Sequence, residues 1–83
     1  MPKEYQILER KEIPEILQRH GITRQYQKAR DAFLRGDTLQ IKFQERNPKG
    51  CGIWYFRINK KYRALGTFDE LGRLIVYEID THQ

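Results

Sequence analysis

The sequence WYFRINKKYRALG, residues 54–66, contains two alternating runs joined by the basic segment Asn59-Lys60-Lys61. In the first run Trp54, Phe56 and Ile58 fall on one side, as in a strand that buries one face against a core. The second run begins at about Tyr62 and continues to residue 68. Together the two runs predict a β-hairpin with a cationic turn.

Positive charge is concentrated around this hairpin. Residues 42–63 carry seven lysine and arginine side chains and one acidic side chain, which gives a local charge of +6 in a chain whose net charge is +5. Residues 1–41 amount to +2 and residues 64–83 to −3. Such focusing is typical of proteins that bind nucleic acid, although a merely solvated basic face is the alternative interpretation.

Length and composition predict one small soluble domain, residues 1–83. Hydrophobic residues make up 39% of the chain, and no apolar run is long enough to span a membrane. The first residues do not resemble a secretory signal, so we expect a cytoplasmic protein. The single Cys51 cannot form an internal disulfide, and the two histidines offer no zinc cluster. We therefore expect no cofactor and no metal.

Two helices are predicted before the hairpin. The first predicted helix covers residues 12–20, with Pro14 in its first turn and Gly21 at its end. Its inward-facing residues are Ile13, Ile16 and Leu17. Thr23 is predicted to cap a second helix, which ends at Gly36. Its inward positions recur at helical spacing and comprise Tyr26, Ala29 and Phe33. Residues 4–8 fit either a strand or the start of a helix.

Two further strands complete the prediction. Leu39, Ile41 and Phe43 alternate with polar residues and predict a strand before the Asn47-Pro48 turn. Residues 74–82 predict a last strand, in which one face is made of Ile75, Tyr77 and Ile79. The fold class expected is α+β, with a helical hairpin packed on one face of a small antiparallel meander. The open face is expected to carry the side chains of Tyr55, Arg57, Arg63, Glu78 and His82.

The motif Trp54-x-x-Arg57-Ile58-x-x-x-Tyr62-Arg63-Ala64-Leu65-Gly66, followed by Leu74-Ile75-Val76-Tyr77 and Thr81-His82, resembles the RelE/ParE superfamily of bacterial toxins. The similarity covers about residues 23–83 and is greatest to the RelE-like, plasmid-stabilisation branch. It implies a RelE-like fold and a type II toxin that cuts messenger RNA on the ribosome and is neutralised by a cognate antitoxin protein.

The resemblance also implies catalytic positions. Arg63 matches the strand arginine that contacts the scissile phosphate, and Arg57 matches a basic residue on the preceding strand. His82 falls where this branch carries an arginine or a histidine, and its unperturbed pKa would suit a general base. The two arginines could clamp the phosphate and stabilise the charge that develops on it. Alternatively, Arg57 could simply pair with Glu78 across neighbouring strands.

The remaining site residues are predicted to bind RNA. Tyr55 could stack on a base. The lysines would contact phosphates without sequence preference, and they are Lys42, Lys49, Lys60 and Lys61.

Two other functions stay open. Many relatives carry a further tyrosine or basic residue beyond the last strand, and this sequence has none after His82, which favours a decayed toxin that only binds RNA or antitoxin. A ParE-like inhibitor of DNA gyrase is the third hypothesis, because that branch shares the fold but not the catalytic residues.

Overall fold

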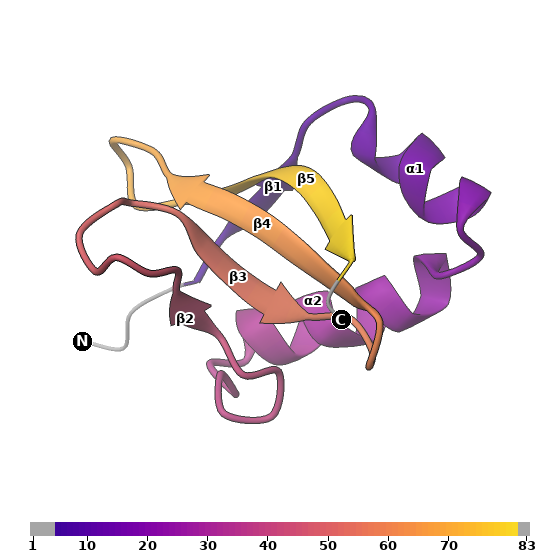
Figure 1. Cartoon of the computed structure of the whole chain (residues 1–83), viewed down its shortest axis with the longest axis horizontal. Helices are drawn as coiled ribbons and strands as arrows, with labels where there is room; N and C mark the ends of the chain where they lie inside the picture. The colour runs from indigo at the N-terminus through magenta and orange to yellow at the C-terminus, as the bar shows by residue number, and fades with distance from the viewer. Residues whose placement is uncertain (1–4, 82–83) are drawn as a thin grey trace.

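In the described part of the chain, five strands form one mixed sheet in the order β1-β5-β4-β3-β2, and two helices lie between the first and second of these strands in sequence (Figure 1). The computed structural model describes residues 5–81. The elements along the chain are β1 (Ile7–Glu9), α1 (Ile13–Arg19), α2 (Thr23–Leu34), β2 (Gln44–Glu45), β3 (Trp54–Arg57), β4 (Tyr62–Phe68) and β5 (Leu74–Thr81). The predicted α+β class is therefore confirmed.

Both helices end at the predicted glycines. Gly21 and Gly36 have φ angles of 68° and 80°, a left-handed conformation that glycine adopts without steric cost. After α2, the Gly36 amide donates to the Phe33 carbonyl and the Asp37 amide donates to the Ala32 carbonyl. This pair of bonds is the Schellman motif, which satisfies carbonyls that the helix leaves free.

The core lies between the helices and one face of the sheet. Phe56 of β3 is fully buried, and its ring centroid lies 6.0 Å from that of Tyr26 and 6.3 Å from that of Phe33, both on α2. Ala64 of β4 is also fully buried on this face. The inward positions predicted for the central hairpin are thus confirmed, and the polar positions of β3 face away from the helices.

The sheet differs from the predicted antiparallel meander at one edge. The ambiguous N-terminal segment forms β1, which pairs parallel to β5 with Ile7 opposite Leu74. A parallel connection needs a long crossover, and here the crossover contains both helices. All other strand pairs are antiparallel.

The strand predicted over residues 39–43 is wrong. This segment is a series of turns in which the Lys42 amide donates to Leu39 and the Phe43 amide donates to Thr38. Leu39 is 91% exposed, and Lys42 has a φ of 53°. The apolar alternation still buries Ile41, but it does so through a compact loop, and only Gln44–Glu45 pair as strand β2.

The face predicted for β5 is wrong over its first half. Leu74 and Val76 are buried in the core, whereas Ile75 lies on the other face. A bulge then places Glu78 opposite Leu65 and Val76 opposite Gly66, so Tyr77 is the extra residue. Beyond the bulge Ile79 packs against the core, as predicted.

The helices are short. The longer of the two described helices, α2, has 12 residues, and neither helix in residues 5–81 has the length and apolar character needed to cross a membrane.

Candidate functional site

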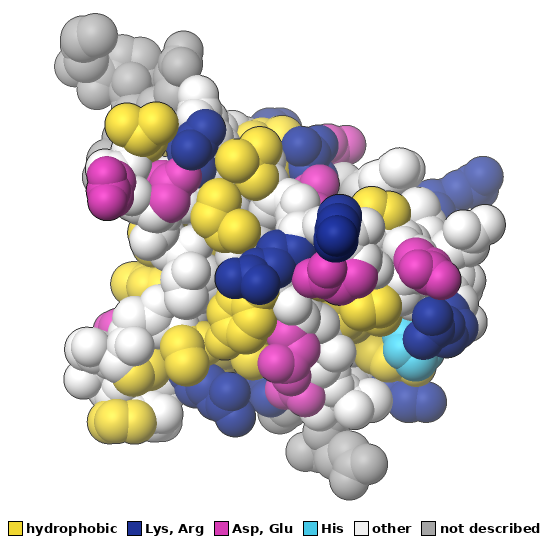
Figure 2. All heavy atoms as spheres, turned by 90° about the horizontal axis from the view of Figure 1, so that it is seen from above, with side chains coloured by type: hydrophobic (Ala, Val, Ile, Leu, Met, Phe, Trp, Pro, Cys, Tyr) yellow, Lys and Arg dark blue, Asp and Glu magenta, His cyan; other side chains and the backbone are white. Residues whose placement is uncertain are grey.

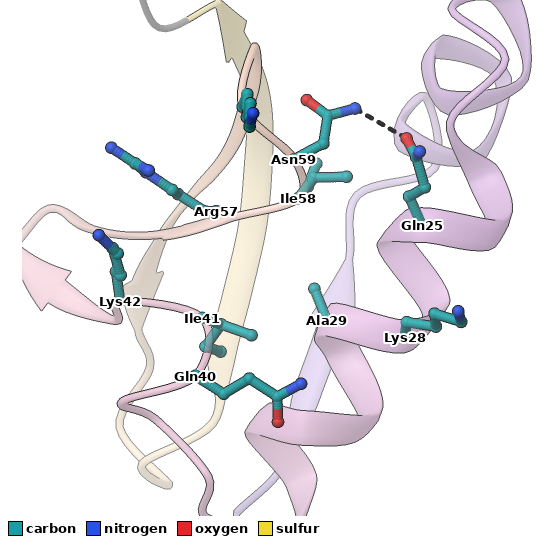
Figure 3. Close-up of a pocket in the computed structure, with 10 residues that line it drawn as sticks. Gln25, Lys28, Ala29, Gln40, Ile41, Lys42, Arg57, Ile58 and Asn59 are labelled. Carbon is teal, nitrogen blue, oxygen red and sulfur yellow. Dashed lines mark hydrogen bonds between the residues drawn. The ribbon is translucent and has the colours of Figure 1, made fainter.

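A cavity of about 390 Å³ opens where α2, the turn before β2 and the end of β3 meet (Figure 3). Ala29, Ile41 and Ile58 form its apolar floor. Polar amides come from Gln25, Gln40 and Asn59. Cations complete the lining and are Lys28, Lys42, Arg57 and Lys60.

The charge around this cavity is of one sign. Four of its ten lining residues are cationic, and none of the ten is acidic. Within residues 5–81, no carboxylate forms an ion pair with any of these four cations. Clustered cations without counter-charges create a positive potential that attracts anions such as phosphate. The cavity is therefore suited to an anionic ligand.

Backbone geometry positions the cations on the sheet side. The positive φ of Lys42 turns the chain sharply beside β3, and the Arg57 amide donates to the Ile41 carbonyl at 2.8 Å. This bond holds the turn against the end of β3. Figure 3 shows the Lys42 and Arg57 side chains extending away from α2 and the Lys28 side chain extending outward from α2, so these charged ends surround the cavity and do not point into it.

Asn59 fixes the hairpin turn that carries Lys60. Its side-chain oxygen accepts hydrogen bonds from the amides of Lys61 and Tyr62, each at 2.8 Å. Its side-chain nitrogen donates to Gln25 of α2 at 2.7 Å (Figure 3). The hairpin turn is thus tied to the helix, and this contact limits how far the cavity can change its width.

The open face of the sheet carries a second group of side chains. Arg57 and Arg63 are directly opposite each other in β3 and β4. Arg63 donates to the Asp80 carboxylate at 2.5 Å, and its guanidinium lies 4.7 Å from the centre of the Tyr55 ring. Tyr55 accepts a hydrogen bond from Gln44 at 2.7 Å. The Arg63 side chain is only 16% exposed, so its charge is largely neutralised and covered.

These positions decide how the predicted site residues are grouped. Lys42, Arg57 and Lys60 all line the cavity. Arg63 and Tyr55 form the separate stacked pair, and Arg57 does not pair with Glu78 within residues 5–81. Other predicted residues lie apart from the cavity: Lys49 is exposed in the loop before β3, and Lys61 lies over the Tyr62 ring. His82 lies outside the described residues.

Sequence reasoning missed several residues of these groups, among them two cavity residues and the partner of Arg63. Lys28 and Gln40 line the cavity, and Asp80 binds Arg63. Lys28 follows Gln25 by three residues on α2, which places both on one helix face, but nothing in the sequence shows that this face borders the hairpin. Asp80 was predictable in part, since Arg63 and Asp80 would be opposite in a regular β4–β5 ladder.

No protein-family model matches this sequence, and neither does any protein in a search of curated proteins.

A second polar cluster ties β1 to α2. One oxygen of Glu9 accepts from the Tyr26 hydroxyl at 2.8 Å and from Arg30 at 2.9 Å. Burial, together with the nearby Glu9 carboxylate, raises the pKa of Tyr26 above its ordinary value. A tyrosine that holds its proton so firmly is a poor proton donor, so we assign this cluster to stability.

The face of the molecule seen from above is mixed in charge. Figure 2 shows a face on which lysine and arginine side chains lie beside acidic and apolar ones. Within the described part of the chain, no group of three or more histidine, cysteine or acidic residues is arranged to hold a metal ion. The chemistry that the cation-lined cavity offers is the binding of phosphate esters through direct charge and hydrogen bonding.

Proposed function

We propose that this protein is a RelE-like toxin that binds messenger RNA at the ribosome in the cytoplasm and cuts it. The observation that carries the proposal is the cavity whose lining includes Lys28, Lys42, Arg57 and Lys60 and no carboxylate. A phosphodiester chain is the abundant biological ligand that such a cluster binds without needing a metal.

The chain order also supports the proposal. Relatives in this superfamily carry a strand before the two helices, a feature that this sequence forms poorly, and in the structure the short strand β1 takes this position. The resemblance further implies basic residues on neighbouring strands, and Arg57 and Arg63 are opposite each other in β3 and β4.

In this proposal Arg57 acts on the reacting phosphate. Its guanidinium can donate two parallel hydrogen bonds to phosphate oxygens and stabilise the negative charge that grows during attack by the 2′-hydroxyl. Lys42 and Lys60 would hold the neighbouring backbone of the RNA. His82 remains the proposed base for the 2′-hydroxyl proton. The antitoxin would be a protein whose acidic segment covers these cations.

The ion pair of Arg63 favours a second candidate function. Because Asp80 holds Arg63, this arginine is not free to bind a phosphate in the structure described here. A protein that uses Arg57 and the lysines to bind RNA, without cutting it, fits the same geometry. This candidate is the non-catalytic RNA-binding module.

Inducible expression in bacteria tests both candidates. Wild type would be compared with Arg57→Gln and with Arg24→Gln, which removes an exposed arginine of α2 that does not line the cavity. We expect growth arrest and cuts inside the translated part of a reporter message for wild type and Arg24→Gln. Arg57→Gln should lose at least about 100-fold in cleavage, the scale of removing one charge-stabilising donor.

The outcomes separate the hypotheses. Arrest without cuts would select the RNA-binding module. Normal growth with a soluble, folded wild-type protein would contradict the toxin proposal. Trapping of gyrase on DNA would select the ParE-like function instead.

A further inference from the structure

We propose that the cavity holds one nucleotide of single-stranded RNA, with the base against the apolar floor and the flanking phosphates on the surrounding cations. In this arrangement Lys28 binds a phosphate and Gln40 reads the edge of the base. This inference rests on the proposed function, because RNA as the class of ligand comes from that proposal.

The dimensions and floor of the cavity fit a nucleotide. Its volume of about 390 Å³ lies within the range of pockets that hold small organic ligands. Ala29 and Ile41 are buried, and with Ile58 they provide an apolar surface between α2 and β3 (Figure 3). A planar base has large apolar faces, so it gains by leaving water for such a surface.

The cations lie on both sides of this floor. Lys42 and Arg57 come from the sheet side and extend away from α2, and Lys28 comes from the helix and extends outward from it (Figure 3). A nucleotide within a strand has a phosphate on each side of its sugar. By changing rotamer, these long side chains on two sides of the cavity can reach both phosphates of one nucleotide, whereas a simple anion would need only one group of cations.

Among the side-chain amides that line the cavity, that of Gln40 is available to bind a ligand. The Gln25 amide oxygen already accepts a hydrogen bond from Asn59, whereas the Gln40 side chain makes no hydrogen bond within residues 5–81. Figure 3 shows Gln40 extending from the turn toward α2. A glutamine amide carries both donors and an acceptor and can bind a base edge at two points. Gln40 is thus the residue that would create a base preference.

The role of Lys28 is tested by the salt dependence of RNA binding. The probe is a set of fluorescently labelled four-nucleotide RNAs, and the quantity measured is the slope of log affinity against log salt concentration. Lys28→Gln should weaken binding to every sequence and reduce the magnitude of the slope by about 0.7, the value for one phosphate contact on a single strand. Lys11→Gln, an exposed lysine that does not line the cavity, is the matched control and should leave the slope unchanged. Equal slopes for the two variants would overturn the inference.

The role of Gln40 is tested by base preference. The four RNAs would differ only in carrying A, C, G or U throughout. Wild type should prefer one base, and Gln40→Ala should reduce this preference by about fivefold or more while keeping the salt slope, since an amide carries no charge. Gln18→Ala, an exposed glutamine of α1, should keep the wild-type preference. A preference unchanged in Gln40→Ala would overturn the nucleotide assignment.

Two further comparisons identify the source of the ligand. Free nucleoside monophosphates and inorganic phosphate should compete for the labelled RNA much more weakly than an unlabelled RNA of four nucleotides. Competition by inorganic phosphate as strong as by RNA would overturn the inference.

The toxin function can fail independently of this inference. RNA binding that depends on Lys28 and Gln40, without growth arrest, would contradict the toxin function and leave the inference intact. Growth arrest that is unaffected by both substitutions would contradict the inference alone.

Discussion

The surroundings of Arg63 in the structure differ from those that its sequence motif implies. The family resemblance implies a free arginine on the open face. In the structure Asp80 accepts its hydrogen bond, Tyr55 covers its guanidinium, and within the described residues its Nε atom is buried without a hydrogen-bond partner. A buried donor left unsatisfied costs free energy, so Arg63 depends on Asp80 for compensation.

Asp80→Asn should therefore have opposite effects on stability and on RNA binding. Loss of the carboxylate should lower the free energy of unfolding by about 1–3 kcal/mol, because the arginine keeps its charge and loses its partner. The freed positive charge should at the same time strengthen RNA binding. Urea unfolding and fluorescence anisotropy would measure the two effects.

Glu78→Gln is the matched control for this prediction. It removes the same charge from the same strand, but Glu78 is exposed and forms no ion pair within residues 5–81. We expect a stability change within about 0.5 kcal/mol, as for ordinary surface substitutions. If both variants bind RNA equally well, net charge rather than release of Arg63 explains the gain.

Among the elements, the β4–β5 turn is fixed by one carboxylate. Asp69 accepts hydrogen bonds from the backbone amides of Leu71 and Arg73 and from the Arg73 side chain, at 2.7–2.9 Å. The backbone bond from Arg73 is the main reason that the pKa of Asp69 lies below its ordinary value. The ionised carboxylate therefore favours the folded turn.

The pH dependence of Asp69→Asn follows from this lowered pKa. The stabilisation by Asp69 is fully present above the ordinary pKa of 3.8 and is lost as pH falls through the lower pKa of the folded protein. Asp69→Asn should lower the urea midpoint at pH 7, and the difference from wild type should shrink below about pH 4. Glu70→Gln is the exposed control, with little effect at either pH. A difference that stays constant down to pH 2 would contradict the assigned role of the carboxylate.

Prediction from sequence succeeded for elements whose signals are local. The helix-ending glycines and the alternation of Trp54, Phe56 and Ile58 are local, and the structure confirms them. The failures at residues 39–43 and in β5 have non-local causes. Ile41 is held by a backbone bond to β3, and the β5 bulge depends on its pairing with β4, so neither could be derived from alternation alone.

For the whole molecule, the site was predictable in charge but not in shape. Counting charges located the cationic region between residues 42 and 63. The cavity also needs Lys28 from α2 and the left-handed turn at Lys42, which only the tertiary packing brings together. Arg63 does not line this cavity, and its pairing with Asp80 was only partly predictable from the sequence.

RNA binding should stabilise the whole protein, because a ligand that binds only the folded state shifts the folding equilibrium toward that state. RNA at 100 times its dissociation constant adds about 2.7 kcal/mol to the free energy of unfolding. In a domain this size, this corresponds to a rise in Tm of about 10–20 °C. Thermal scans with a four-nucleotide RNA at 50 mM salt would measure it.

The same scan in 1 M salt is the control, because salt weakens phosphate contacts and the rise in Tm should nearly disappear. A Tm that does not change with RNA at low salt would contradict binding to the folded state.

The bulge in β5 has an evolutionary consequence. Because Tyr77 is an extra residue in the pairing with β4, loss of one residue at the bulge would leave Ile79 toward the helices and Asp80 beside Arg63. Loss of one residue nearer the start of β5 would instead exchange the inner and outer faces of that half of the strand. Descendants of this chain can thus change length at the bulge without losing the fold, while the rest of β5 has a fixed number of residues.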